Sequence, residues 1–440
     1  MPIPRYRPQR PAAVALAVSL AALAPSLASA QSLIQLYDAA HAYDAAYLAA
    51  RSVYESAPYR VEQARALMRP SVNATATGGH AEYRPNDFSR SNSSTYGATV
   101  SGRQPIFNRF NNASISQSER SLVSSLADLD SAEQELMLRV SQAYFDVLGA
   151  QDTLATNRAN KAAISEQLAS AKRNFEVGTA TITDTREAQA RFDLATAQEI
   201  AAENDLVTRR IALDQLVGQS NVTPKQLAVP VVLPVPQSPV DDYVARAAEQ
   251  HPAVRRAMVA YEVAQLETEK ARAQRLPTID AVASAGNGRG LFAQGVNGQN
   301  ASVGVQLTVP LYSGGAIQNR IKETLALEER ARNDLDAARR GVTQTTRQAY
   351  YTLLSGAAQV KALEAAEASS QLALEATQVG YRVGIRVNVD VLNAQSQLFQ
   401  TRRDLARARY DVLLATLRLR QASGQLTPSD VLAIDRLLAP

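Results

Sequence analysis

Two aspartates, Asp184 and Asp390, stand at matching points of a duplicated chain, each six residues after a glycine. An aspartate at the start of a helix accepts hydrogen bonds from free backbone N–H groups and faces the positive end of the helix dipole. Glu187 follows Asp184 by three residues, which is the spacing of a capping box. Helix capping is therefore one interpretation of both aspartates, and a functional role for their carboxylates is the alternative.

Residue types that carry catalysis are scarce in this chain. It has no cysteine, and its three histidines, His41, His80 and His251, lie far apart without a spaced acidic partner. A metal site or a catalytic triad needs such partners, so we expect no catalytic residue, no metal and no cofactor. Each histidine is expected on the surface or between helices. The glycine-rich stretch 286–290 lies between two expected strands rather than before a helix, which favours a hairpin loop over a phosphate-binding loop.

Residues 1–30 have the form of a secretory signal peptide. Three arginines precede an apolar run that is too short to cross a bilayer as a helix, and small residues at 28–30 suit signal peptidase. The leader holds those arginines and no acidic residue, so the formal net charge of +4 drops close to neutral in a mature chain that begins at Gln31. Without a concentrated basic face, we expect no nucleic acid partner.

The rest of the chain contains an internal repeat, whose two copies are offset by about 206 residues. The matched positions include Gly178 with Gly384, Asp184 with Asp390, and Gly218 with Gly424. So long a period is unlike the short repeats of solenoid proteins. We therefore divide the chain into a first repeat over 31–227, a proline-rich linker over 228–240, a second repeat over 241–427 and a C-terminal segment over 428–440.

Each repeat predicts the same order of elements. A helix over 33–67 or 241–276 ends at a proline, two extended runs follow, and then comes a long helix over 108–175 or 316–378. Sixty-odd residues make a rod about 100 Å long, far longer than an average globular helix. Each rod turns at a glycine, and a return helix covers 184–217 or 390–423. The return helix of the second repeat carries apolar residues seven apart, at Val391, Leu398, Leu405, Val412 and Leu419. This spacing predicts coiled-coil packing.

The extended runs cover 71–83, 95–106, 278–286 and 301–312. In the last of them Val303, Val305 and Leu307 alternate with polar or small residues, which predicts one apolar and one polar face. Strands of this length can cross an outer membrane, although a sandwich strand with one solvated face is the commoner alternative. Four strands are too few to close a barrel, so a membrane role requires copies from other chains. Three copies would give twelve strands.

With these elements in place, the sequence resembles the TolC family of outer membrane efflux proteins over nearly all of its mature length. The matching stretches are residues 32–37 (SLIQLY), 142–148 (QAYFDVL), 175–184 (FEVGTATITD) and 380–392 (GYRVGIRVNVDVL), with similarity continuing through 406–410 and 424–438. The resemblance implies a mainly α homotrimer: long antiparallel coiled coils form an α-barrel, and four strands from each protomer form a twelve-stranded transmembrane β-barrel. It also implies the outer membrane as location, with the helices extending into the periplasm and the C-terminal segment in an equatorial belt.

The resemblance implies a function and partners as well. Family members are exit channels for tripartite efflux pumps and type I protein secretion. They work with a periplasmic adaptor, an inner membrane transporter and outer membrane lipid, and they pass drugs or proteins as transit substrates. A non-channel periplasmic adaptor or coiled-coil stalk protein is the alternative. Two membrane-length strand pairs at equivalent points of a duplicated chain argue against it.

By the same resemblance, residues at the two turns form a gate. Thr183 and Asp184 of the first repeat would link to Tyr381 and Arg386 of the second as a latch. Asp390 from three chains would form an acidic ring at the pore constriction, and rings of carboxylates attract cations. Some family members carry a second acidic ring one helical turn further on, where this chain has Asn393. We therefore expect weaker cation selectivity than in a two-ring relative.

Overall fold

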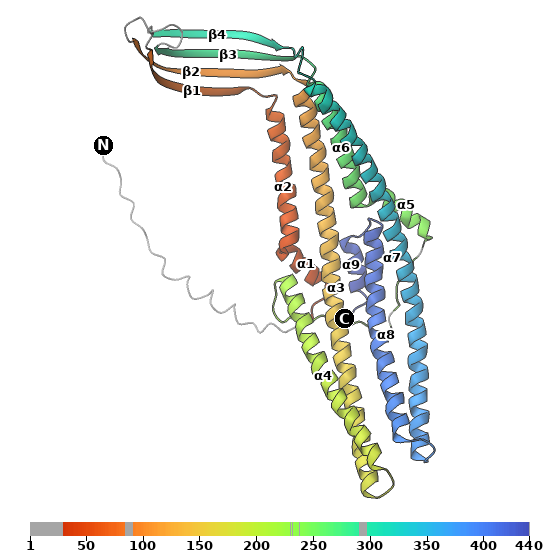
Figure 1. The fold of residues 1–440 in the computed structure, drawn as a ribbon. Coiled ribbons are helices and arrows are strands. Elements are labelled where there is room, and N and C mark those ends of the chain that lie inside the picture. Colours follow the sequence, from red (N-terminus) through yellow and green to blue (C-terminus); the bar gives the residue numbers. More distant parts are fainter. Residues whose placement is uncertain are drawn as a thin grey trace, which may run out of the picture.

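The computed structural model describes residues 30–83, 91–228, 230, 232–236, 238–289 and 297–439. The expected signal peptide lies outside these ranges except for Ala30. Residues 84–90 and 290–296 of the loops expected over 84–94 and 287–300 also lie outside them, and the rest of each expected loop belongs to the strands. The molecule is long and narrow, with a four-stranded sheet at one end and two helical turns at the other (Figure 1).

The first repeat follows the predicted order with one break. Its helices are α1 (Leu33–Tyr43), α2 (Ala45–Ala66), α3 (Arg109–Glu176) and α4 (Ile182–Val217), and its strands are β1 (Ser71–Tyr83) and β2 (Ser91–Phe107). The prediction of one helix over 33–67 was wrong, because the chain bends at Asp44. This residue has an extended backbone, ends α1 and caps α2, since its side chain accepts a hydrogen bond from the Tyr47 N–H.

The second repeat contains the same elements in the same order. They are α5 (Val240–Gln250), α6 (Pro252–Ala273), β3 (Thr278–Arg289), β4 (Asn297–Thr308), α7 (Ala316–Arg382) and α8 (Asn388–Ala422), followed by α9 (Pro428–Asp435). The single helix predicted over 241–276 was also wrong. The break falls at His251, one residue before Pro252, where a proline disfavours helical backbone in the preceding residue and is well placed to begin a new helix.

The two rods confirm the predicted long helices. Helix α3 has 68 residues and α7 has 67, so each extends about 100 Å. The return helices α4 and α8 pack along them, and α3 lies between α4 and α8 (Figure 1). All five of the heptad residues predicted on α8 are buried, with exposed fractions of 3% or less. The coiled-coil prediction is therefore confirmed. None of the described helices has an apolar stretch long enough to cross a membrane.

The four strands form one antiparallel sheet in the order β1-β2-β3-β4. Its register places Val100 opposite Ala285, and Ala285 opposite Ala301, so apolar side chains of neighbouring strands share one face. Ser101 opposite Ser284, and Ser284 opposite Ser302, mark the polar face. The apolar face is bare: Val303 is 89% exposed and Val305 is 70% exposed. Strands β1 and β4 are open edges, so the sheet has both an uncovered face and two unpaired sides.

The main core lies halfway along the rods, where both ends of the described chain meet. Leu33, Leu36, Tyr144, Leu213 and Leu417, from four helices, are almost fully buried there. The Leu33 N–H donates to Asp435 Oδ1 at 2.7 Å, so α9 caps the start of α1. Backbone bridges join Gln31 to Pro224 and Leu227 to Leu438. These contacts fix the C-terminal segment against the first repeat at mid-height.

Candidate gate and pore-lining site at the helix turns

The first turn joins α3 to α4 and is closed by its own side chains. Gly178 has a φ of +80°, a left-handed conformation that suits glycine, and ends the rod. Thr181 is the N-cap residue of α4, and its side chain accepts a hydrogen bond from the Asp184 N–H. The Asp184 carboxylate in return accepts from the Thr181 hydroxyl at 2.7 Å and from its N–H at 3.0 Å. This is a complete capping box.

Asp184 therefore takes part in capping, but at a different position from the one predicted. Asp184 is the third residue of α4 and the inner partner of the box, whereas we expected it at the start of the helix with Glu187 as its partner. Glu187 instead faces Arg191 one turn further on, at 3.8 Å. Thr183, the neighbouring latch candidate, is exposed.

The second turn joins α7 to α8 and lacks such a box. Gly384 has a φ of +78°, matching Gly178, but the N-cap residue of α8 is Val387, whose side chain cannot accept a hydrogen bond. Asp390 is the third residue of α8, where we had expected the first. Its carboxylate lies 3.6 Å from Arg386 Nη1. At this distance the ion pair is loose, and the Asp390 carboxylate is not used for capping.

Three of the latch candidates have contacts of their own within the chain. The Tyr381 hydroxyl accepts a hydrogen bond from Asn174 Nδ2 at 3.3 Å, which connects the ends of α7 and α3. Arg386 pairs with Asp390, and Asp184 pairs with Thr181. Within the described chain, no hydrogen bond joins Thr183 or Asp184 to Tyr381 or Arg386. The latch pairing stays a prediction.

Asn393 lies on the exposed surface of α8, next to a cation that the sequence did not reveal. Arg191 Nη2 donates to Asn393 Oδ1 at 3.1 Å and so joins α4 to α8. A carboxylate at position 393 would lie beside this guanidinium, which would partly neutralise its charge. Neither Asn174 nor Arg191 could be identified from the sequence, because their partners come from the other repeat. A polar residue close to each turn was the only available signal.

A seam of amide side chains joins α3 to α8 above the turns. Gln167 donates through Nε2 to Asn388 Oδ1, and Gln395 Nε2 donates to the Asn160 carbonyl at 3.4 Å. Asn160, Asn388 and Gln395 are all buried, with exposed fractions of 6% or less. Asn160 Oδ1 and Asn388 Nδ2 have no hydrogen-bond partner. Unpaired buried polar atoms cost free energy, so this seam holds the two repeats together less firmly than an apolar core would.

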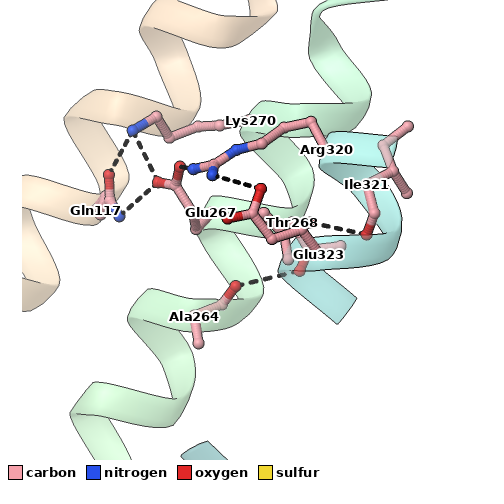
Figure 2. A network of polar contacts seen from close by, with 9 residues as sticks. Gln117, Ala264, Glu267, Thr268, Lys270, Arg320, Ile321 and Glu323 are labelled. Atoms are coloured by element: carbon pink, nitrogen blue, oxygen red, sulfur yellow. Dashed lines mark hydrogen bonds and ion pairs between the residues drawn. The ribbon is translucent and has the colours of Figure 1, made fainter. Parts of the chain in front are cut away.

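At the opposite end, a charged network ties the rods together beneath the sheet (Figure 2). Glu267 of α6 accepts hydrogen bonds from Lys270 at 2.9 Å, Arg320 of α7 at 2.8 Å and Gln117 of α3 at 3.1 Å. Burial alone would raise the pKa of Glu267, but these hydrogen bonds outweigh it and lower the pKa. Arg320 also pairs with Glu323. The network fixes three helices at the sheet, far from the open seam at the turns.

The histidines lie apart, and each has a local contact. His41 packs its ring against Tyr47 at 4.3 Å, His80 is hydrogen-bonded to Ser94 at 3.0 Å, and His251 caps α6. Across the described ranges, no three His, Asp or Glu side chains come together as metal ligands.

Known proteins are similar in sequence to most of this chain. The sequence profile of the family described as "Outer membrane efflux protein" matches residues 36–219 and 244–425, one segment in each repeat. The chain is 33% identical to "Outer membrane protein TolC" of Vibrio cholerae, over 92% of this chain and 93% of that protein. It is also 33% identical to "Alkaline protease secretion protein AprF" of Pseudomonas aeruginosa, over 77% of this chain and 71% of that protein.

Solved structures share the fold at lower sequence identity. CusC superposes with a TM-score of 0.79 at 16% identity, covering 90% of this chain and 92% of that one. VceC of Vibrio cholerae superposes with a TM-score of 0.76 at 18% identity, covering 89% and 96%. The predicted fold class, with long helices and a strand region for a barrel, is confirmed. With both repeats matched by one family profile and a relative at 33% identity over most of its length, this chain belongs to the outer membrane efflux protein family.

Proposed function

We propose that three copies of this chain assemble into a gated exit channel in the outer membrane, whose helices extend into the periplasm. The observation that carries the proposal is the sheet. It has one bare apolar face, one polar face and two open edges, and it lies at the end of rods about 100 Å long. Three sheets joined edge to edge give twelve strands, which closes the edges and turns the apolar face toward lipid.

Cargo and partners follow from the relatives. Their names describe an alkaline protease secretion protein in Pseudomonas aeruginosa, a proteases secretion protein in Dickeya chrysanthemi and an outer membrane efflux protein in Brucella suis. By analogy, this channel passes drugs, proteins or both, and works with a periplasmic adaptor and an inner membrane transporter. The proposed role includes no catalytic step.

Fractionation and conductance test the channel. The full-length protein should be extracted from outer membranes as a trimer and should form ion-conducting pores in planar bilayers. Recovery from the soluble periplasm as a protein without conductance would contradict the proposal and would support an adaptor or stalk protein instead. Crosslinking in cells, followed by identification of the captured proteins, would name the adaptor and the transporter.

The gate has its own test at the turns. We propose that Thr183 and Asp184 link to Tyr381 and Arg386 in the closed trimer, and that Asp390 lines the constriction. Tyr381→Phe combined with Arg386→Ser should then raise single-channel conductance, because the turns of the two repeats separate more easily. The matched control is Arg382→Ser, which removes a neighbouring exposed arginine of α7. Equal conductance in the double variant and in the wild-type trimer would contradict the latch.

A further inference from the structure

Two cavities lie between α4 and α8 along α3, and we call the space that they share the groove; Figure 1 shows how the three helices are arranged. Near the turns the groove deepens into a cavity of about 480 Å³, which reaches from Asn393 on α8 to Arg403 on the same helix. Ligand sites for small molecules commonly have volumes in this range. The cavity belongs to one chain, and both repeats contribute to its wall.

The charge in this cavity is unbalanced. Its lining contains Arg191 and Arg403, and no lining residue described by the structure is acidic. Arg403 Nη1 donates to the neutral Asn157 Oδ1 at 3.1 Å, and its other amino group donates to Gln400 Oε1. Arg191 donates to the neutral Asn393, and its carboxylate neighbour Glu187 is 3.8 Å away on the outside of the lining. The amides add no negative charge, so Arg403 has no ion pair within the described chain and Arg191 has only the loose one with Glu187.

A second cavity in the same groove shows the opposite arrangement. It measures about 210 Å³, lies further from the turns and contains two arginines as well, Arg209 and Arg407. Here, however, three aspartates share the lining, at positions 146, 205 and 411. Arg209 lies 3.1 Å from Asp146 and 3.3 Å from Asp205. The lining therefore contains acidic residues beside the arginines in the second cavity and none in the first.

The cavity is also elongated and has an apolar wall. Asn393, the contact of Arg191, precedes Arg403 by ten residues on α8, a rise of about 15 Å. Leu194 and Ala195 follow Arg191 along α4 and line the cavity, together with Ile164 of α3. We propose that the cavity is a binding site for an elongated organic dianion, with one anionic group at each arginine and a short apolar chain between them.

Such a ligand would bridge the two repeats. Arg191 belongs to α4 of the first repeat and Arg403 to α8 of the second, so a bound dianion adds one contact to each side of the weak amide seam. Binding therefore favours the packing of the two repeats against each other. The binding itself does not rest on the proposed channel, whereas its effect on conductance does, and the two can be measured separately.

The test is calorimetric titration of the full-length protein, purified in detergent, with suberate as the probe. Suberate is an unbranched dicarboxylate. Octanoate has the same number of carbons and one carboxylate, and 1,8-diaminooctane has two positive charges in place of the negative ones. We expect saturable binding of suberate, at least about tenfold tighter than octanoate, and no binding of the diamine. Arg403→Gln should lower suberate affinity about tenfold, to the level of octanoate.

Two further variants test whether the first cavity and its positive charge are responsible for binding. Arg209→Gln removes a paired arginine from the second cavity and should leave suberate binding unchanged. Gln397→Glu adds a carboxylate to the lining without removing an arginine and should abolish binding. The proposal is overturned if suberate does not bind, if it binds no better than octanoate, or if folded, helical Arg403→Gln protein binds it as tightly as the wild type. Bilayer conductance with and without suberate then reports on the channel alone.

Discussion

The two turns occupy equivalent places in the repeats and use the same aspartate differently. In the first turn the carboxylate of Asp184 is bound by the hydroxyl and the N–H of Thr181, so it stabilises the start of α4. In the second turn Val387 replaces the threonine, and Asp390 is left with a loose contact to Arg386 at 3.6 Å. The carboxylate therefore caps a helix in the first repeat and does not do so in the second. The aspartate stands at the same position in both repeats, and the residue at the N-cap differs.

The kinks in the shorter helices show a similar division. Asp44 bends the first repeat with an ionised group, whose Oδ1 accepts from the Tyr47 N–H at 2.8 Å and from Arg139 at 3.0 Å. His251 bends the second repeat with a neutral ring, whose Nδ1 accepts from the Ala253 N–H at 3.1 Å. Equivalent bends are therefore capped by a carboxylate in the first repeat and by an imidazole ring in the second.

The largest stability effect is expected at the first kink. Asp44→Ala removes the cap of α2 and leaves Arg139 without its carboxylate, and Asp44 is only 8% exposed. The free energy of unfolding should fall by about 2–3 kcal/mol. Denaturant titration of the full-length protein in detergent measures it. Asp44→Asn keeps the acceptor and should lose about half as much. A loss below about 0.5 kcal/mol in Asp44→Ala would mean that the kink does not depend on this side chain.

The comparison of the turns predicts unequal effects on ion selectivity. Asp390→Ala should lower the cation-to-anion permeability ratio about threefold, because a ring of three carboxylates is lost from a narrow pore. Asp184→Ala should lower the ratio less, because that carboxylate is bound by Thr181 and lies outside the proposed constriction. Reversal potentials across a salt gradient measure both. Equal decreases of the permeability ratio in the two variants would contradict the difference proposed between the turns. An unchanged ratio in Asp390→Ala would mean that this residue lies outside the constriction.

Local patterns predicted the rods and the sheet well, because their signals repeat along the sequence. Residues with heptad spacing, such as Val391 and Leu405, recur along the whole helix, and alternating residues such as Val303 recur along the strand. Each element is therefore indicated by several residues. The first kink was missed because apolar spacing continues through Asp44, where one side chain caps the new helix. The second kink had a signal in Pro252, which begins α6. Pairs such as Arg191 with Asn393 could not be predicted at all. They join hairpins about two hundred residues apart, whose relative rotation depends on the packing of whole helices.

The second kink should weaken as the pH falls. Burial lowers the pKa of His251 below its ordinary value of 6.5, because the charged ring is poorly solvated. The contribution of the neutral ring is therefore complete above about pH 6.5 and is lost as the pH falls through the lower folded-state pKa. A protonated Nδ1 also cannot accept from the Ala253 N–H, which removes a cap worth about 1 kcal/mol. His251→Asn keeps an acceptor that does not titrate. Its unfolding free energy should depend less on pH below 6.5, and an identical pH dependence would contradict this account.

The smallest effect is expected when the second turn receives the N-cap residue of the first turn. This substitution tests the comparison of the two turns most directly. Val387→Thr places a hydroxyl at the N-cap of α8, three residues before Asp390, as Thr181 stands before Asp184. The new capping box should stabilise the protein by about 0.5 kcal/mol. It should also draw the Asp390 carboxylate toward the backbone, so cation preference should fall slightly. Val387→Ala, which cannot cap, is the matched control and should show neither change. Greater stability with unaltered selectivity would mean that an aspartate can cap α8 and still face the pore. In that case, the absence of a threonine at the N-cap does not explain why Asp390 faces the pore.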